Sequence, residues 1–300
     1  MNKKYWIILL ITMVLLTSCG EKKVEIKEMS FGMMPSDSAM PLVVAEREGY
    51  FKEEGIDVNL ELFFSAKDRD SAFHTGNING ADYDLVTALM TSNSDFELLV
   101  GSASEGSFKF VGTTENPNDI VNKKLGISKN TVIEFYTDKF LKEFEIAQDS
   151  IQKEEIPQIP VRLQMLGSGE IAGAVLPDPL ASLAIKKGSH LIKDSVDFEN
   201  QVGVFVFNKK FANDNKELIE KFYKAYNRGG AYMNSHDVED YLPLLIEKLN
   251  FPAPISETYK PLNYREKTMP SKESVEEVNQ WLLERELIKE AVKYDDLIIK

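Results

Sequence analysis

Apart from acids, the residue types that most often carry chemistry are sparse in this 300-residue chain. Its histidines are scattered at His74, His190 and His236, and its one cysteine is Cys19. Because zinc sites need several clustered Cys or His ligands, we expect no metal site. The sequence also lacks a GxxxxGK[ST] phosphate loop, a GxSxG nucleophile elbow and an HExxH helix. Carboxylates remain as candidates for catalysis, because the paired acids of a hydrolase have no fixed spacing.

A bound cofactor is also not expected. The glycines at 167, 169 and 173 superficially suggest a dinucleotide-binding fingerprint, but they follow an expected helix and precede an expected strand. A dinucleotide site requires the opposite order. We therefore interpret this stretch as the end of a helix.

Composition and charge exclude several classes of protein. The chain has 35 basic and 48 acidic residues, which gives a net charge of −13. Proteins that bind nucleic acid carry a basic surface, so this chain is not expected to bind nucleic acid. A hydrophobic content of 43% with 17 phenylalanines is enough for a sizeable core. The chain is expected to be globular, with one large or two moderate domains.

The N-terminus has the pattern of an export signal. Lys3 and Lys4 precede a mostly apolar stretch from Tyr5 to Leu16. This stretch is shorter than the roughly 20 apolar residues that span about 30 Å of hydrocarbon. A short basic segment followed by a short apolar segment is typical of a signal peptide.

The lone cysteine directly follows this apolar stretch. The sequence from Leu16 to Cys19 resembles a bacterial lipobox, which implies that Cys19 is lipidated and becomes the mature N-terminus. We expect a signal peptide at 1–18, a tether at 19–24, and a protein held by lipid on the extracytoplasmic face of the bacterial cell membrane. The alternative is an ordinary secretory signal with a chance cysteine.

The remaining sequence predicts two successive β/α units and a helical tail. In the first unit, strands are expected at 24–31, 58–62, 82–87 and 97–100, and helices at 41–48 and 65–75. In the second unit, strands are expected at 108–111, 124–127, 154–156, 171–176 and 202–207, and helices at 131–144, 160–166 and 179–187. Beyond residue 208 the chain is expected to be nearly all helix, at 217–233, 238–249 and 271–287. This order predicts an α/β protein of two lobes that share a hinge, with the tail packed on one lobe.

Four segments, in order, resemble one family. PLVVAEREGYFKEEGIDV, at 41–58, is similar to the first helix-to-strand segment of solute-binding proteins of nitrate/taurine-type ABC importers, a group that includes binders of thiamine-precursor pyrimidines. Residues 72–84, 127–131 and 166–182 match further segments of that family. Asn79 and Ala172 stand where the family usually has Asp, and Asp178 stands where it has Glu. The resemblance extends from about residue 25 to residue 211.

This resemblance implies a bilobal type II periplasmic-binding-protein fold, with two mostly parallel sheets flanked by helices and a helical C-terminal segment. Lobe 1 is expected to hold residues 25–107 plus 207–300, and lobe 2 residues 108–206. The implied function is a receptor that closes on a small solute and delivers it to an ABC permease driven by its ATPase. Such a protein is not an enzyme.

Ligands of open α/β sheets bind at the carboxyl ends of the strands, and the family implies the same loops. Five of these loops carry polar side chains in this sequence. The residues expected to contact the ligand are Ser36, Asp37, Ser65, Thr87, Ser128, Asn130, Thr131 and Asp178.

Three of these loops have a second interpretation. Thr131 with Glu134 has the spacing of a capping box, so Thr131 either caps a helix or contacts the ligand. Asp37 either caps the helix near Pro41 or contacts the ligand. Arg69 is either a solvated helix charge, which its position between Asp68 and Asp70 favours, or a clamp for an anion.

The expected ligand is a small polar organic solute. Two acids and few basic residues on these loops favour an aminopyrimidine-like ligand or a zwitterionic amine over nitrate. The alternatives for function are a surface-anchored hydrolase that uses carboxylates and a fungal-type pyrimidine synthase. We disfavour the synthase because such enzymes look cysteine-rich.

Overall fold

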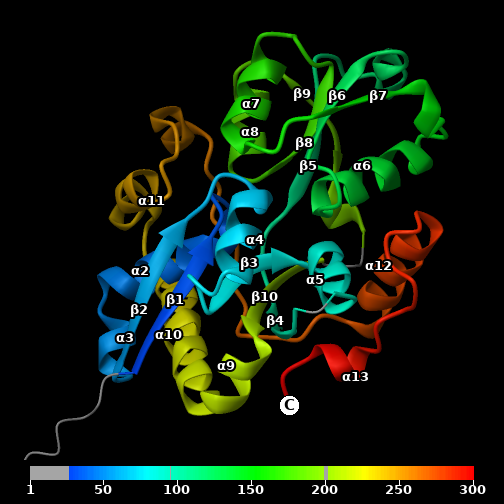
Figure 1. Ribbon diagram of the computed structural model, residues 1–300. Coiled ribbons are helices and arrows are strands. Elements are labelled where there is room, and N and C mark those ends of the chain that lie inside the picture. Colours follow the sequence, from blue (N-terminus) through cyan, green and yellow to red (C-terminus); the bar gives the residue numbers. More distant parts are fainter. Residues whose placement is uncertain (1–26, 95, 199–201) are drawn as a thin grey trace, which may run out of the picture.

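The computed structural model describes residues 27–94, 96–198 and 202–300 (Figure 1). The predicted signal peptide, the tether and Cys19 lie outside these residues. Within the described part of the chain, no helix is both long and apolar enough to cross a membrane.

The first sheet has five strands in the order β2-β1-β3-β10-β4. Four of them run in one direction, and β10 runs antiparallel to both of its neighbours. The strands are β1 (Lys27–Met33), β2 (Ile56–Leu62), β3 (Gly80–Asp84), β4 (Leu98–Ala103) and β10 (Gly203–Asn208).

The second sheet repeats this plan in the order β7-β6-β8-β5-β9. Here β5 is the strand that runs antiparallel to its neighbours. The strands are β5 (Phe108–Gly112), β6 (Lys124–Ile127), β7 (Gln152–Glu155), β8 (Gly173–Pro177) and β9 (His190–Asp194). The expectation of two mostly parallel sheets is therefore confirmed.

We refer to the first sheet and its helices as lobe 1 and to the second sheet and its helices as lobe 2. The chain passes into the second sheet between β4 and β5 and returns between β9 and β10. β10 begins at Gly203, so the boundary expected at residue 206 falls inside a strand of the first sheet. The apolar run at 202–207 predicts a strand correctly, but its pattern does not reveal which sheet it joins.

Helices cover both sheets (Figure 1). In lobe 1, Phe31 of β1 packs against Phe205 of β10 and against Phe222 of α10 (Lys216–Ser235), with ring centroids 5.1 and 4.9 Å apart. The helices of lobe 2 are α6 (Val132–Glu143), α7 (Ile159–Gly167) and α8 (Leu180–Lys186). The other helices are α2 (Met40–Arg47), α3 (Tyr50–Glu53), α4 (Ala66–His74), α5 (Leu85–Ser92), α9 (Lys209–Asp214), α10 (Lys216–Ser235), α11 (Leu242–Lys248), α12 (Lys272–Glu284) and α13 (Tyr294–Leu297).

The local expectations differ from the structure in three places. The strand expected at 82–87 ends at Asp84, because the Asp84 carboxylate accepts the Thr87 backbone N–H and begins α5. Strand β9 is not predicted at all. The tail is also less helical than expected, since residues 259–270 contain no regular element.

The C-terminal tail contacts both lobes rather than one. Helix α12 packs against α5 of lobe 1. From the same helix, the Trp281 indole N–H donates to Asp138 of α6, and Arg285, just after the helix end, pairs with Glu134 and Asp138. Figure 1 shows α12 beside the junction of the two lobes.

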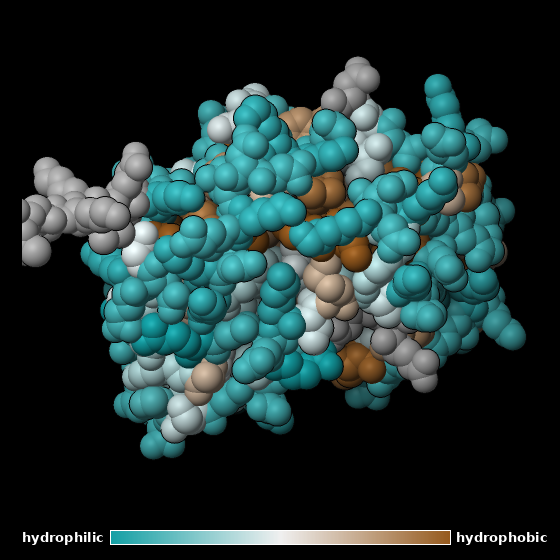
Figure 2. Space-filling view, turned by 90° about the horizontal axis from the view of Figure 1, so that it is seen from below, coloured by the Kyte–Doolittle hydropathy of each residue, from teal (hydrophilic) through white to brown (hydrophobic). Residues whose placement is uncertain are grey.

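The face of the molecule seen in Figure 2 is mostly hydrophilic, with apolar residues confined to a few patches. This agrees with the acidic composition of the chain.

Candidate functional site

A cavity of about 600 Å³ lies between the two lobes. This volume is typical of a small-molecule site. Hydrogen bonds join the lobes around it: the Asp37 N–H donates to the Asp178 carbonyl at 3.2 Å, and the Ile159 N–H donates to the Phe64 carbonyl at 3.0 Å. The Gln158 side-chain amide donates to Asp68 at 2.8 Å. The structure therefore shows the lobes in contact, with the cavity between them.

Asp37 provides a carboxylate on the lobe 1 side. Its side chain is buried, lines the cavity and has no hydrogen-bond partner among the described residues. It caps no helix, contrary to one of the two interpretations of the sequence. Burial raises the pKa of Asp37 from 3.8 to about 7, while the charge of Lys109 opposes this rise and that of Asp194 adds to it.

Two further acids of lobe 1 line the cavity but have partners. Asp82 accepts hydrogen bonds from the hydroxyls of Ser38 and Ser36, at 2.6 and 3.3 Å. Asp84 accepts the hydroxyl and the backbone N–H of Thr87. Burial raises the pKa of both carboxyls to about 6. Their hydrogen bonds orient the Ser36 loop and the start of α5.

Arg69 is buried and lines the cavity, so its interpretation as a solvated helix charge is wrong. Its guanidinium pairs with Asp70 at 2.7 Å and donates to the Asp82 carbonyl at 2.9 Å. It also stacks on the Tyr83 ring, 4.0 Å from the centroid. The sequence pattern fails here because the charges on either side of Arg69 suggest an exposed helix face.

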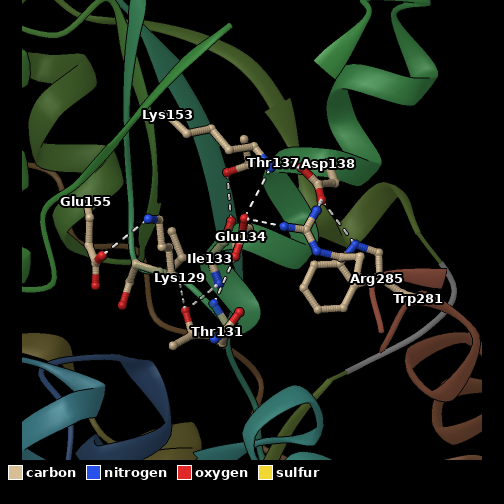
Figure 3. Close-up of polar contacts among 12 residues, drawn as sticks. Lys129, Thr131, Ile133, Glu134, Thr137, Asp138, Lys153, Glu155, Trp281 and Arg285 are labelled. Carbon is tan, nitrogen blue, oxygen red and sulfur yellow. Dashed lines mark hydrogen bonds and ion pairs between the residues drawn. The ribbon is translucent and has the colours of Figure 1, made fainter. Parts of the chain in front are cut away.

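On the lobe 2 side, the N-terminus of α6 reaches the cavity through Ser128 and Thr131. Figure 3 shows Thr131 and Glu134 at this end of the helix. The Thr131 hydroxyl accepts the Ile133 N–H and donates to the Ser128 carbonyl. Glu134 accepts the Asn130 N–H at 2.8 Å and is paired with Lys153 and Arg285. Thr131 is therefore a helix cap that also faces the cavity.

Asp178 lines the cavity, but its carboxylate is engaged by the protein. One oxygen accepts the backbone N–H and the hydroxyl of Ser182, at 3.0 and 2.8 Å. The other accepts the Ser107 hydroxyl and pairs with Lys109. These contacts connect the end of β8 to the start of α8 and to β5.

Aromatic rings form another part of the lobe 2 wall. Tyr136 lies between Phe108 and Phe198, with ring centroids 5.5 and 6.2 Å away, and all three residues line the cavity. The tail contributes to the cavity as well, through Arg265, Thr268, Met269, Pro270, Ser271 and Ser274.

Five of the eight residues expected to contact a ligand line this cavity: Ser36, Asp37, Ser128, Thr131 and Asp178. The other three lie outside it. Ser65 caps α4 by accepting the Asp68 N–H, Thr87 donates to Asp84, and Asn130 takes a positive φ of 58° before α6.

Sequence reasoning missed Asp82, Asp84 and Arg162. Asp82 and Asp84 stand on either side of Tyr83 in β3, and all five residues of this strand are buried. The available signal was two acids at alternate positions in an otherwise uncharged strand. Arg162 shares the buried face of α7 with Ile159 and Leu166, so an arginine on an apolar helix stripe was the available signal.

Within the described residues, no group of three or more His, Cys, Asp or Glu side chains is arranged to hold a metal ion.

Comparison with solved structures supports the fold. The ligand-binding component of an ABC-type import system from Staphylococcus aureus, solved with zinc bound, matches with a TM-score of 0.75 and 16% identity, over 91% of this chain and 96% of that chain. The periplasmic aliphatic sulphonate-binding protein SsuA from Escherichia coli matches with a TM-score of 0.75 and 15% identity, over 91% and 97%. The periplasmic nitrate-binding protein NrtA from Synechocystis PCC 6803 matches with a TM-score of 0.68 and 11% identity, over 83% and 75%. These proteins share the periplasmic-binding-protein fold with this chain.

No relative was found among curated protein sequences. A family model does match, over residues 37–239, which include both sheets except β1 and most of the cavity wall. The chain therefore belongs to the NMT1/THI5-like family.

Proposed function

We propose that this protein is the extracytoplasmic solute-binding receptor of an ABC importer, which delivers a small polar organic solute to a permease and its ATPase. The observation that carries the proposal is the cavity between two lobes, lined by the Asp37 carboxylate, which has no hydrogen-bond partner among the described residues. Family membership supports it, as do similar folds whose names describe ligand-binding components of import systems. In a receptor of this kind, a ligand that contacts both lobes stabilises the closed state.

The ligand that best fits this cavity carries N–H donors. The Asp37 carboxylate accepts hydrogen bonds and favours a positive or N–H-bearing group opposite it. The rings of Phe108, Tyr136 and Phe198 line the cavity and give a ligand an apolar surface to pack against. An aminopyrimidine-like solute or a zwitterionic amine satisfies Asp37, whereas nitrate leaves this carboxylate buried beside an anion.

A carboxylate hydrolase has less support. Such an enzyme needs one carboxyl as acid and a second as base or nucleophile, both facing the substrate. Of the three lobe 1 aspartates that line the cavity, Asp82 and Asp84 already accept hydrogen bonds from serine and threonine.

A thermal-shift screen of purified protein tests the proposal. The panel contains aminopyrimidines, amino sulfonates, amino acids, quaternary amines and nitrate. A true ligand at 100 times its Kd adds about 2.7 kcal/mol of stability and is recovered unchanged by mass spectrometry. Failure of every solute class to stabilise the protein, or recovery of a cleaved solute, would contradict a receptor function.

Lipid anchoring is a separate part of the proposal, which rests on the resemblance of Leu16–Cys19 to a lipobox. Cys19→Ser should release the protein from the membrane fraction or leave it as an unprocessed precursor. Fractionation with immunoblotting measures this. A Cys19→Ser protein that is cleaved before residue 19 and still pellets with membranes would show that the anchor lies elsewhere.

A further inference from the structure

The side chain of Arg162 is buried in lobe 2, where it packs against a glycine of the second sheet. The residue is 1% exposed, and it lines the cavity. Its stem passes over Gly126 of β6, where an added Cβ would lie 3.1 Å from the Arg162 Cγ. Any larger residue at 126 would crowd the arginine. Gly126 therefore leaves room for the Arg162 side chain near the carboxyl end of β6.

The charge of Arg162 has no acidic partner. Its Nη1 donates to the carbonyls of Ile156 and Pro157, at 2.6 and 3.3 Å, and its Nε has no hydrogen-bond partner in the described part of the chain. Across the described residues, no carboxylate forms an ion pair with it, in contrast to Arg69, which pairs with Asp70. An unpaired buried charge is costly, so this site gains from a bound anion. Burial lowers the pKa of Arg162 to about 10, which leaves it charged at neutral pH.

The N-terminus of α6 lies at the same edge of the sheet. β6 and β7 are parallel neighbours, and the Ile156 N–H donates to the Ile127 carbonyl at 2.8 Å. The loop after β6, which holds Ser128, therefore lies beside the loop that holds the Arg162 guanidinium. The N-terminus of a helix favours an anion through its free N–H groups and its dipole.

The acid in the first turn of α6 does not cancel this effect. Glu134 is paired with Lys153 at 3.2 Å and with Arg285 at 2.7 Å, so its negative charge is compensated (Figure 3). Ser128 lines the same cavity, and its hydroxyl is a further hydrogen-bond donor there.

We propose that Arg162, the Ser128 hydroxyl and the N-terminus of α6 form an oxyanion subsite on lobe 2. This inference rests on the proposed receptor function and specifies its ligand. The solute is bipolar: a carboxylate, sulfonate or phosphate group binds lobe 2, and an ammonium or other N–H group faces Asp37 on lobe 1. A solute of this kind contacts both lobes, so each of its charged ends stabilises closure.

Sulfate is the probe for this subsite. Thermal unfolding is followed as sodium sulfate replaces sodium chloride at constant ionic strength. Sulfate also stabilises proteins in general by exclusion from their surface, so the diagnostic signal is a saturable component that depends on Arg162. Arg162→Gln should weaken sulfate binding by about tenfold or more, because a hydrogen bond to a charged group is lost. The control is Arg47→Gln, since Arg47 is a surface residue of lobe 1 paired with Glu48.

A second variant covers the case in which Arg162→Gln does not fold. Ser128→Ala removes one hydroxyl, leaves the buried arginine in place, and should weaken sulfate binding several-fold. Sulfate stabilisation that is unsaturable, or equal in wild type and in both variants, overturns the subsite.

Failure of the bipolar-ligand inference can be told apart from failure of the receptor function. A solute found in the thermal-shift screen that has no anionic group overturns the bipolar ligand while the receptor function stands. A solute that has both charges, and whose affinity falls in both Arg162→Gln and Asp37→Asn, supports it.

Discussion

Asp37 links the chemistry of the cavity to pH. Burial raises its pKa to about 7 while the lobes are in contact and no solute is bound, so a large share of Asp37 is protonated in that state at neutral pH. A cationic or N–H-donating solute stabilises the ionised form and lowers this pKa again. Binding is therefore coupled to the release of a proton.

The first prediction concerns this coupling. Affinity for the solute should increase as the pH rises from about 5 to about 8, by at most about tenfold per unit below the pKa of Asp37. Asp37→Asn should weaken binding and flatten the pH dependence, measured by calorimetry in buffers of different ionisation enthalpy. An unchanged pH profile in Asp37→Asn would show that another group releases the proton.

Asp37 should also affect the stability of the free protein. Its pKa in the folded state lies above the unfolded value of 3.8, so the folded chain binds more protons between these two pH values. To the extent that the solute-free protein holds the lobes in contact, its contribution therefore makes that protein lose stability as the pH rises from about 4 to about 7. Denaturant unfolding of wild type and Asp37→Asn over this range measures the contribution as the difference in slope. Equal slopes would contradict a raised pKa.

Asp178 is predicted to act mainly as a structural residue. Its carboxylate accepts hydrogen bonds from Ser107 and Ser182 and pairs with Lys109. Asp178→Asn should lower the free energy of unfolding by about 1–3 kcal/mol, because it leaves the half-buried Lys109 with a weaker partner. The control Asp119→Asn alters an exposed acid of the same lobe and should leave the denaturation midpoint unchanged. A fully stable Asp178→Asn protein that binds solute weakly would instead make Asp178 a ligand contact.

At the scale of elements, α12 connects the two lobes through α6. Arg285 pairs with Glu134 at 2.7 Å and with Asp138 at 2.6 Å, and both acids are buried (Figure 3). Glu134 also accepts the Asn130 N–H next to the cavity. The C-terminal tail therefore supports the helix end that forms one wall of the site.

Removal of this support gives the next prediction. Arg285→Ala should lower the free energy of unfolding by about 1–3 kcal/mol, because Glu134 and Asp138 then share the single cation Lys153. It should also weaken solute binding, because Arg285 no longer holds Glu134, which accepts the Asn130 N–H in the loop before α6. Arg228→Ala is the matched control: its partners Glu53 and Glu54 are more exposed, so its effect should be small. Equal losses in both variants by chemical denaturation would contradict a special role for α12.

Local signals explain which elements the sequence predicts. The start of α6 is predicted because Thr131 and Glu134 have capping-box spacing, which acts within one turn. The start of α5 is missed because Asp84 caps it from the end of a buried apolar strand, so the whole stretch resembles a longer strand. The path of the tail across both lobes depends on the Arg285 ion pairs, which join residues far apart in the sequence.

The site is predicted only in part, because the sequence shows where loops end strands but not which side chains meet in space. The strand-end rule finds loops, and it places Ser36, Asp37, Ser128, Thr131 and Asp178 at the cavity. It does not reveal which side chains are already used by the protein, as Ser65 and Thr87 are. Arg162 lies outside those loops, on a helix whose apolar stripe indicates a core position.

At the scale of the whole molecule, the two lobes touch each other beside the cavity that lies between them. The Asp37–Asp178 and Phe64–Ile159 backbone hydrogen bonds both join lobe 1 to lobe 2. In a receptor that closes on its solute, contacts of this kind form as the two lobes come together. The receptor account therefore requires an open state of the solute-free protein, related to this one by a hinge where the chain passes between β4 and β5 and between β9 and β10.

Small-angle X-ray scattering of the purified mature protein, with and without a solute found in the screen, tests this claim most directly. The account predicts that the solute-free protein has a larger radius of gyration than the structure described here, and that a saturating solute reduces it to that of the structure. In Asp37→Asn, a higher solute concentration should be needed for the same reduction. A radius of gyration that stays constant while calorimetry shows the solute to be bound would contradict a receptor that closes on its solute.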